Sequence, residues 1–271
     1  MRSALLVLTA AAVLGGGYAV AQEAQKAQAP AAASATPAAK PRPVGYLTGG
    51  EVLDGTKFLA PYPAKGSAAE AYDIAAWREA LKLENTPRWK QAADDDPVSL
   101  KDGLTRFQCA VGLKLDAQNA PVLMSLLGKA QIDTGQAVNK AKDHFKRPRP
   151  FADDPKAPTC LPIPPESRSK VSTAYPGGHS SLGMAWGLIL AELAPDRGAQ
   201  IMDRVRDYSH SRLVCGIHYP SDLEAGHTLG AALVARLHAE PEFRADLDKA
   251  RAEVAAARTA QKSPPAGCAG S

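Results

Sequence analysis

Several features are missing from the sequence, and each absence excludes a class of protein. It has no long run of lysine and arginine, and its net charge is only +4, so nucleic acid is a poor candidate partner. Alternating, β-branched segments are nearly absent, which argues against a sheet protein. Beyond the N-terminus no apolar run is long enough to cross a bilayer, which excludes a polytopic membrane protein. With 45% hydrophobic residues among 271, the chain can nevertheless bury a full core.

The N-terminus has the pattern of a secretory signal peptide. Arg2 precedes an apolar run over residues 4–14, and residues 19–21 form a small-x-small cleavage site. We therefore assign residues 1–21 to a signal peptide and expect export to the periplasm without stable membrane insertion. An uncleaved anchor helix is the alternative, but the apolar run is short and is followed by three glycines.

Two flanking stretches have too few large apolar groups to offset the entropy of ordering them. Residues 22–43 consist mainly of Ala, Pro, Gln and Lys and are predicted to be a flexible linker. Residues 260–271 have a similar character and are predicted to be a flexible tail. The folded domain is therefore expected over residues 44–259.

Cysteine is scarce, with only four residues in the chain. No two of them lie at chelating spacing, which disfavours a zinc cluster. An exported protein meets an oxidising compartment, so one or two disulfides are expected, and the sequence leaves three complete pairings open. The four residues are Cys109, Cys160, Cys215 and Cys268.

The predicted domain has the composition of an all-α protein, a single-domain helical bundle. Its long segments are rich in Ala, Leu, Glu, Lys and Arg, with Gly or Pro clustered between them. Residues 182–193 are apolar on nearly all sides, which predicts a central buried helix. The predicted helices span residues 68–83, 97–113, 120–144, 178–193, 198–213, 221–238 and 242–257.

The first segment whose residues could bind a ligand lies at the end of the predicted helix over residues 120–144. Lys142 and Arg149 belong to a cluster of cations there, and prolines stop the helix directly afterwards. A solvated basic terminus that complements the helix dipole is the simpler interpretation of this segment alone. The functional interpretation is a lysine and an arginine that reach forward together into an anion site.

A second segment leads into the apolar helix and contains Gly177, Gly178 and His179. The two glycines allow a ligand to approach the backbone closely, and the free N–H groups of the first helical turn form an anion pocket. His179 is placed where it can donate a proton to a molecule bound there. A tight turn with a capping histidine is the competing interpretation.

The third segment joins Ser211 and Arg212 to His218 and Asp222. Pro220 signals a helix start, which places Asp222 in the first turn and His218 just before it. A carboxylate there can accept the Nδ1–H of His218 and leave Nε2 with an oriented lone pair, as a nucleophilic histidine requires. The alternative is a helix-capping aspartate beside a structural histidine.

Together the three segments supply three cations, a glycine-rich helix start and two histidines, a set that suits a tetrahedral oxyanion such as phosphate. Their order and spacing resemble the signature of the acid phosphatase and vanadium haloperoxidase superfamily, and more narrowly the bacterial class A non-specific acid phosphatases. The segments that begin at Phe58, Asn85 and Cys215 also resemble that class. The resemblance covers roughly residues 45–237.

Two lysine–arginine pairs in the first segment fit the spacing of the family. We assign the motif to Lys142 and Arg149, because the Pro-Phe pair of the family follows Arg149. Lys140 and Arg147 are then expected to face elsewhere.

The second segment departs from the family at Gly177, where serine is usual. The lost hydroxyl removes one phosphate hydrogen bond, worth about 1–3 kcal/mol. The N–H of Gly177 is expected to contribute in its place, and a Gly177→Ser change is expected to keep or raise activity.

The resemblance implies a mechanism that agrees with the residues themselves. His218 attacks phosphorus and forms a phosphohistidine, Asp222 orients it, and His179 protonates the leaving oxygen and then activates water. No metal or other cofactor is required, because the cations already supply the positive charge. The resemblance implies a broad range of small phosphate monoesters, phosphotransferase activity and a homo-oligomer. The predicted phosphate-binding residues are Lys142, Arg149, Gly177, Gly178, Ser211 and Arg212.

Other functions would use part of the same set. A vanadate-dependent haloperoxidase would hold vanadate at His218, and a non-catalytic phosphate-binding protein would need only the anion pocket. A zinc hydrolase would draw ligands from His179, His218, Asp222 and His227, although the neighbouring cations would repel a dication. A lipid phosphatase with this signature normally carries several membrane spans, for which the sequence has no segment.

Overall fold

A computed structural model of the protein describes residues 43–47, 52–171 and 173–268. The predicted signal peptide, and the predicted linker apart from Pro43, lie outside these residues. The described residues form helices, turns and loops and contain no β-strand, so the predicted all-α fold is confirmed. No helix within them is both long enough and apolar enough to cross a membrane.

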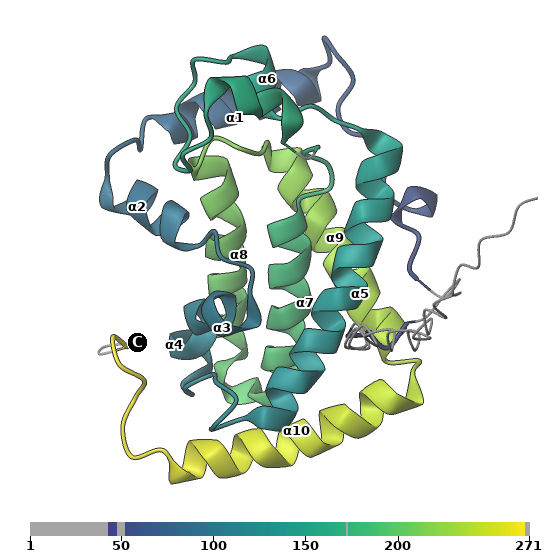
Figure 1. The fold of residues 1–271 in the computed structure, drawn as a ribbon, viewed down its shortest axis with the longest axis vertical. Coiled ribbons are helices and arrows are strands. Elements are labelled where there is room, and N and C mark those ends of the chain that lie inside the picture. The colour runs from purple at the N-terminus through teal and green to yellow at the C-terminus, as the bar shows by residue number, and fades with distance from the viewer. Residues whose placement is uncertain (1–42, 48–51, 172, 269–271) are drawn as a thin grey trace, which may run out of the picture. The chain divides into compact units, whose positions relative to one another are not determined.

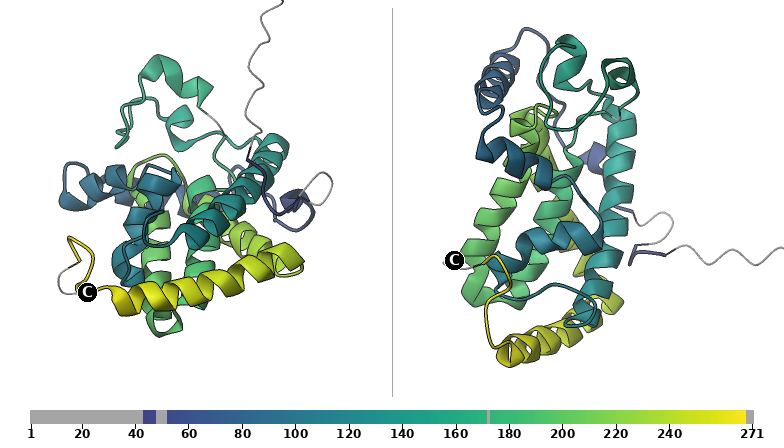
Figure 2. Two further views of the ribbon diagram at one scale, coloured as in Figure 1. Left: turned by 60° about the horizontal axis from the view of Figure 1, so that its bottom comes forward. Right: turned by 60° about the vertical axis from the view of Figure 1, so that its left-hand side comes forward.

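Four long helices form the body of the molecule (Figure 1). Helix α7 (Gly178–Leu193) packs against α5 (Pro121–Phe145), α8 (Gly198–Val214) and α9 (Pro220–Leu237). Helix α10 (Pro241–Ala260) crosses one end of this group, as two further views show (Figure 2). At the opposite end α5 and α8 finish while α7 and α9 begin, so two helix C-termini and two helix N-termini meet there.

Six of the seven predicted helices match observed ones apart from their ends, and the prediction over residues 178–193 coincides with α7. The first of them is α1 (Ala68–Leu81). The prediction over residues 97–113 is wrong in detail, because that stretch breaks into three short pieces. These pieces are α3 (Leu100–Gly103), a 3-10 helix (Leu104–Phe107) and α4 (Gln108–Val111).

Two helices were not predicted, and each begins with a proline at its first position. Helix α2 (Pro87–Asp94) is capped by the hydroxyl of Thr86, and α6 (Pro150–Asp153) follows Arg149. Both are too short to show a clear hydrophobic period in the sequence. Further 3-10 helices span Gly55–Lys57, Pro165–Lys170 and Pro195–Arg197.

Helix α7 is the centre of the core, as its apolar sequence predicts, and its Trp186 and Ile189 have no exposed surface. Two glycines of α9 let it approach α7 closely. A Cβ at Gly226 would lie 2.5 Å from the carbonyl oxygen of Gly177, and one at Gly230 would lie 2.3 Å from that of Ser181. This close approach sets the first turn of α9 directly beside the first turn of α7.

Two disulfides connect distant parts of the chain, Cys109 to Cys268 and Cys160 to Cys215. They settle the pairing that the sequence left open. The second joins the loop after α6 to the end of α8, so it fixes the loop that leads from the first motif to the second.

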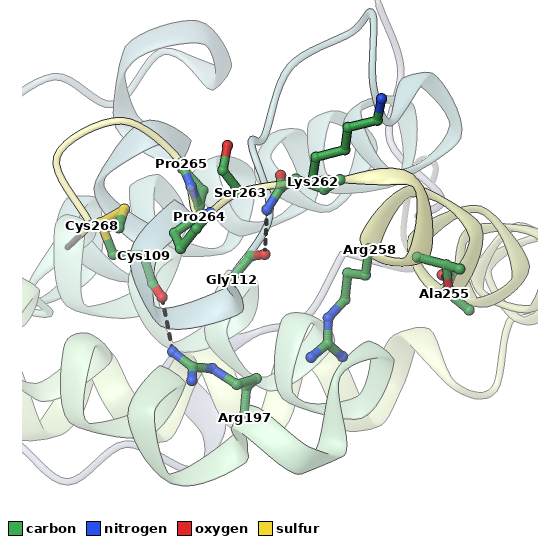
Figure 3. Close-up of a pocket in the computed structure, with 12 residues that line it drawn as sticks. Cys109, Gly112, Arg197, Ala255, Arg258, Lys262, Ser263, Pro264, Pro265 and Cys268 are labelled. Carbon is green, nitrogen blue, oxygen red and sulfur yellow. Dashed lines mark hydrogen bonds between the residues drawn. A yellow bond between two sulfur atoms is a disulfide. The ribbon is translucent and has the colours of Figure 1, made fainter. Parts of the chain in front are cut away.

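The predicted flexible tail requires a correction up to Cys268, the last residue described. The side chain of Gln261 accepts from the backbone N–H of Lys114 at 3.1 Å and donates to the carbonyl of Gly112 at 3.0 Å. Seven residues further on, the disulfide with Cys109 holds the chain against α4 (Figure 3). Composition alone missed this arrangement, because the stretch is held by a covalent bond and amide contacts rather than by apolar burial.

Candidate active site

Residues from all three predicted motifs meet at the end of the bundle where α7 and α9 begin. A pocket of about 330 Å³ opens there. Five predicted site residues line it directly: Lys142, Arg149, Gly178, His179 and His218.

His218 and Asp222 form a buried pair at the start of α9. The Nδ1 of His218 lies 3.1 Å from Oδ2 of Asp222, and the same oxygen accepts the N–H of Tyr219 at 2.8 Å. Asp222 therefore caps the helix and orients the histidine at once. Because its Nδ1 proton points to the carboxylate, His218 carries its lone pair on Nε2, which lies 3.1 Å from Nη1 of Arg149 at the pocket.

The end of α5 positions the two cations of the first motif. Lys146 ends the helix with φ of 51°, so Lys142 lies in its last turn while Arg149 follows in extended backbone. Lys142 donates from Nζ to the carbonyl of Thr173, and Arg149 donates from Nη1 to the carbonyl of Ile217 at 2.9 Å. The pocket is therefore lined by the assigned pair, Lys142 and Arg149.

Burial and mutual repulsion lower the pKa values of these groups. Desolvation, followed by the charge of Arg149, lowers the pKa of Lys142 to about 7. Desolvation, with the charge of Arg212 adding to it, lowers the pKa of Arg149 to about 10. Desolvation and then the charge of Arg149 hold the pKa of His218 well below its usual value, so this histidine is neutral and its Nε2 lone pair accepts from Nη1 of Arg149.

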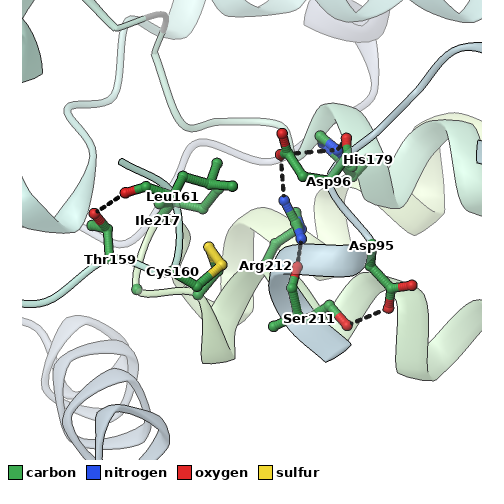
Figure 4. The surroundings of a disulfide bond; sticks show 12 residues. Asp95, Asp96, Thr159, Cys160, Leu161, His179, Ser211, Arg212 and Ile217 are labelled. Carbon is green, nitrogen blue, oxygen red and sulfur yellow. Dashed lines mark hydrogen bonds and ion pairs between the residues drawn. A yellow bond between two sulfur atoms is a disulfide. The ribbon is translucent and has the colours of Figure 1, made fainter. Parts of the chain in front are cut away.

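His179 stands on the first turn of α7 and faces the loop that follows α2. Its Nε2 lies 2.8 Å from the carbonyl oxygen of Asp96 and 3.7 Å from the Oδ1 of that residue (Figure 4). Since a carbonyl only accepts, Nε2 carries the proton. Desolvation, followed by the charge of Arg212, holds the pKa of His179 well below its usual value.

Arg212 lies beside the same loop and has no exposed side-chain surface. Its Nη1 lies 2.7 Å from Oδ1 of Asp96, and its Nη2 donates to the carbonyl of Ala92 (Figure 4). Its Nε is buried and has no hydrogen-bond partner among the described residues. A buried guanidinium with an unused N–H is a suitable anion ligand.

Four predicted site residues do not line the pocket, namely Gly177, Arg212, Asp222 and Ser211, and of these Ser211 faces away from it. Its hydroxyl donates to Oδ2 of Asp95 at 2.6 Å and accepts from Nη1 of Arg88 at 3.0 Å. The predicted phosphate contact is corrected accordingly, because the side chain faces α2 and its neighbouring loop, where its hydroxyl is already hydrogen-bonded.

Gly177 also differs from expectation. Its N–H donates to the carbonyl of Asp222 at 2.8 Å and is therefore not free to bind phosphate. A Cβ at this position would lie 2.9 Å from the same carbonyl oxygen and 3.1 Å from the hydroxyl of Ser180. Glycine is thus required by the approach of α7 to α9, and serine would not fit without a shift. At Gly178, by contrast, a Cβ would contact only Val138, at 3.6 Å.

Lys140 and Arg147, the second pair with the spacing of the family, lie in different surroundings. Lys140 pairs with Asp54 at 3.0 Å, away from the pocket. Arg147 does not line the pocket either, but it is buried and donates to Oδ1 of Asp222 at 2.6 Å and to Oδ2 of Asp73 at 2.7 Å. Arg147 thus supports the carboxylate that orients His218.

Three acidic residues at or near the site were missed by the sequence analysis. Asp73 comes from α1 and shows no signal, because a single aspartate in an amphipathic helix is ordinary. Asp95 and Asp96 lie in a run of three aspartates directly after the segment that resembles the family. That run is the signal that marks an acidic contribution from this loop.

A helical bundle with two histidines and two cations lining one pocket, and a third cation buried beside it, has the features of an enzyme that acts on phosphate esters, and comparisons with known proteins agree. Residues 122–244 match the PAP2 superfamily. An acid phosphatase of Zymomonas mobilis is 36% identical over 207 residues, which are 76% of this chain and 78% of the relative. A non-specific acid phosphatase of Providencia stuartii is 34% identical, over 78% of this chain and 84% of the relative. One of Salmonella typhimurium is 33% identical, over 75% of this chain and 81% of the relative.

The chain therefore belongs to the PAP2 superfamily, together with the bacterial acid phosphatases. It is a phosphoric monoester hydrolase, and the resemblance noted in the sequence is confirmed.

Proposed function

We propose that the protein is an exported, metal-independent acid phosphatase that hydrolyses a broad range of phosphate monoesters through a phosphohistidine on His218. The observation that carries the proposal is the orientation of this side chain. Its Nδ1 proton faces Asp222 at 3.1 Å, while Nε2 lies at the pocket beside Arg149. A neutral imidazole held in this way is an activated nucleophile.

In the first step Nε2 of His218 forms a bond to phosphorus as the bond from phosphorus to the ester oxygen breaks. The bound phosphate dianion favours the imidazolium form of His179, and the leaving oxygen takes the Nε2 proton of this imidazolium, which yields an alcohol and a neutral imidazole. Asp222 stabilises the positive charge that the phosphorylated imidazole acquires. In the second step water gives a proton to His179 and attacks phosphorus, the N–P bond breaks, and inorganic phosphate leaves. An alcohol in place of water would give phosphotransfer.

The non-bridging oxygens of the phosphoryl group would be held by Lys142, Arg149, Arg212 and the N–H of Gly178. These groups are preorganised, because Lys142 and Arg149 are fixed by backbone carbonyls and Arg212 is buried. Four groups that donate to oxygen supply the charge stabilisation that a metal provides in other phosphatases. The zinc alternative lacks one of its ligands at this site, because His227 lines a different pocket between α1, α8 and α9.

Export to the periplasm is supported by the cysteines as well as by the N-terminal sequence. All four form disulfides, which persist in oxidising compartments and are rare in the cytosol.

The proposal is tested by the hydrolysis of p-nitrophenyl phosphate from acidic to neutral pH, with and without EDTA. Wild type, His218→Ala and His144→Ala run side by side, since His144 is exposed and away from the pocket. We expect chelator-resistant turnover in wild type and His144→Ala, and none in His218→Ala. Alkaline quenching followed by mass spectrometry should detect one phosphoryl group on the peptide that contains His218.

Other outcomes would support the alternatives. Turnover abolished by EDTA would favour a metal hydrolase. Phosphate binding without turnover would favour a binding protein, and bromide oxidation after vanadate loading would favour a haloperoxidase. A phosphorylated His218→Ala variant would place the nucleophile elsewhere.

A further inference from the structure

Asp96 makes contact with two groups of the proposed site at the same time. We propose that its carboxylate is a built-in competitor of phosphate: it occupies Arg212 in the empty enzyme and must leave when a phosphoryl group binds. Asp96 thereby sets the affinity of the site for substrate and for inorganic phosphate. This inference rests on the proposed phosphate site.

The contacts of Asp96 carry the proposal. Its Oδ1 lies 2.7 Å from Nη1 of Arg212 and 3.7 Å from Nε2 of His179. Its backbone carbonyl accepts from the same Nε2 at 2.8 Å. A negative oxygen on Arg212 and an acceptor on His179 are the two features that a bound phosphate monoester would present to these residues, so Asp96 imitates part of the ligand (Figure 4).

The side chain is placed so that it can be displaced. It is 39% exposed, whereas the Arg212 that it covers has no exposed side-chain surface. The preceding residue is fixed, because Asp95 accepts from the hydroxyl of Ser211 at 2.6 Å and pairs with Arg204. Asp95 therefore anchors the loop, and a rotation of the Asp96 side chain into solvent releases Arg212 without movement of α2.

Charge gives the direction of the effect. A carboxylate and a phosphate dianion that share one guanidinium lie a few ångströms apart and repel each other, more strongly in a partly buried site than in water. Binding of phosphate must therefore displace the carboxylate or accept this repulsion. The enzyme holds phosphate less tightly as a result, which reduces inhibition by its own product.

The test compares Asp96→Asn and Asp96→Ala with Asp94→Asn in the full mature chain. Asp94 belongs to the same run of aspartates and carries the same charge, but it pairs with the exposed Lys90 and not with Arg212 or His179. The inhibition constant of inorganic phosphate against p-nitrophenyl phosphate and its dissociation constant from calorimetry are measured for each variant. We expect both constants to fall about tenfold in the two Asp96 variants, which corresponds to about 1.4 kcal/mol of binding free energy. Both constants should stay unchanged in Asp94→Asn.

Unchanged or weaker phosphate binding in Asp96→Asn, with a wild-type melting temperature, would overturn the inference. An equal gain in Asp94→Asn would also overturn it, since the effect would then come from net charge alone. A Lys142→Met variant separates this failure from that of the proposed function. If Lys142→Met loses phosphate binding while the Asp96 variants show no gain, the phosphate site stands and only the competitor role is lost. If Lys142→Met binds phosphate normally, the site itself is misplaced and both proposals fail.

Discussion

Arg147 holds Asp222 through the carboxylate oxygen that His218 does not use. Its Nη1 lies 2.6 Å from Oδ1, while His218 contacts Oδ2. The other end of the guanidinium reaches Asp73 at 2.7 Å, and the rings of Tyr219 and Tyr62 lie against it at 4.5 and 5.2 Å. The orientation of the proposed nucleophile therefore depends on a buried chain of charges that begins in α1.

Replacement of Arg147 by Met should damage both stability and the pH profile. Two buried carboxylates would lose their counter-charge, which costs about 3–5 kcal/mol of unfolding free energy. Burial already raises the pKa of Asp222 and Arg147 opposes this rise, so its loss should raise that pKa further. Since the ionised carboxylate is the stronger acceptor of the Nδ1–H of His218 and stabilises the charged form of the ring, the acidic limb of kcat/KM should move to higher pH.

Arg147→Lys provides the matched control, because it keeps the positive charge but cannot bridge both carboxylates. It should lose less stability and shift the acidic limb less. Denaturant unfolding and kcat/KM profiles measure the two effects separately. A less stable Arg147→Met enzyme with an unshifted profile would show that Arg147 supports the fold but not the nucleophile.

Phosphate binding should take up a proton at Lys142 just above neutral pH. The pKa of this amine is lowered to about 7 in the empty site, first by desolvation and then by Arg149. A bound dianion favours the charged amine and raises the pKa of Lys142. At a pH about one unit above the pKa of the empty site, the amine is therefore mostly neutral in the free enzyme and protonated in the phosphate complex. Calorimetry in buffers of different ionisation enthalpy measures the uptake.

The sign of the pH dependence follows from the same shift. Affinity for phosphate should be high below pH ~7, where Lys142 is already charged, and should weaken as the pH rises through that value. Lys142→Met should remove both the proton uptake and this part of the pH dependence. Equal proton uptake in that variant would assign the proton to another group, with His179 the next candidate.

Gly177→Ala should be less stable and less active than wild type. Its Cβ would lie 2.9 Å from the carbonyl oxygen of Asp222, so α7 and α9 must move apart at the first turn of each. Overpacking of this kind costs about 1–3 kcal/mol. The expected cost in activity is about tenfold, because Asp222 and Gly178 would shift together.

Gly177→Ser adds the hydroxyl that the family normally carries to the same crowded position. It should lose as much stability as Gly177→Ala and recover part of the activity through a new hydrogen bond to phosphate. Melting temperatures and kcat/KM values for the pair separate crowding from the hydroxyl. Two variants with full stability and activity would show that the close approach of α7 and α9 is not needed.

His179→Ala should discriminate between leaving groups. An alkyl phosphate leaves as a poor alkoxide unless its oxygen is protonated, so its turnover should fall by about 10²–10⁴. The p-nitrophenolate ion needs little protonation, so phosphorylation by p-nitrophenyl phosphate should remain partly intact. Single-turnover rates for the two substrates make the comparison, and an equal loss for both would contradict the acid role of His179.

The sequence predicted what depends on local pattern. The glycines before His179 and the continuous apolar stretch that follows mark the bounds of α7, and Pro220 with Asp222 marks the start of α9 closely enough to derive the contact with His218. Contacts between elements that are distant in the chain could not be predicted from the sequence. Nothing in the sequence shows that Asp73 reaches Arg147, or that the run of aspartates after α2 folds onto Arg212, since both depend on how α1 and α2 pack against α8 and α9.

At Gly177 the sequence shows that the residue is unusual but not what it does in the structure. Glycine at this position is a visible departure from the family, but from the sequence alone its effect is only the loss of a hydroxyl. The structure adds that its N–H is already used and that its missing side chain makes room for the carbonyl of Asp222.

The disulfide between Cys109 and Cys268 turns most of the enzyme into a covalent ring. The predicted catalytic and phosphate-binding residues all lie within that ring, and Cys160 with Cys215 divides it into two smaller loops. A single cut by a protease anywhere inside it would open the ring without releasing a fragment, so the two halves would stay together until the disulfides were reduced. Asp73, Asp95 and Asp96 precede the ring, so one cut between Asp96 and Cys109 would sever the covalent link between these three acidic residues and the rest of the site.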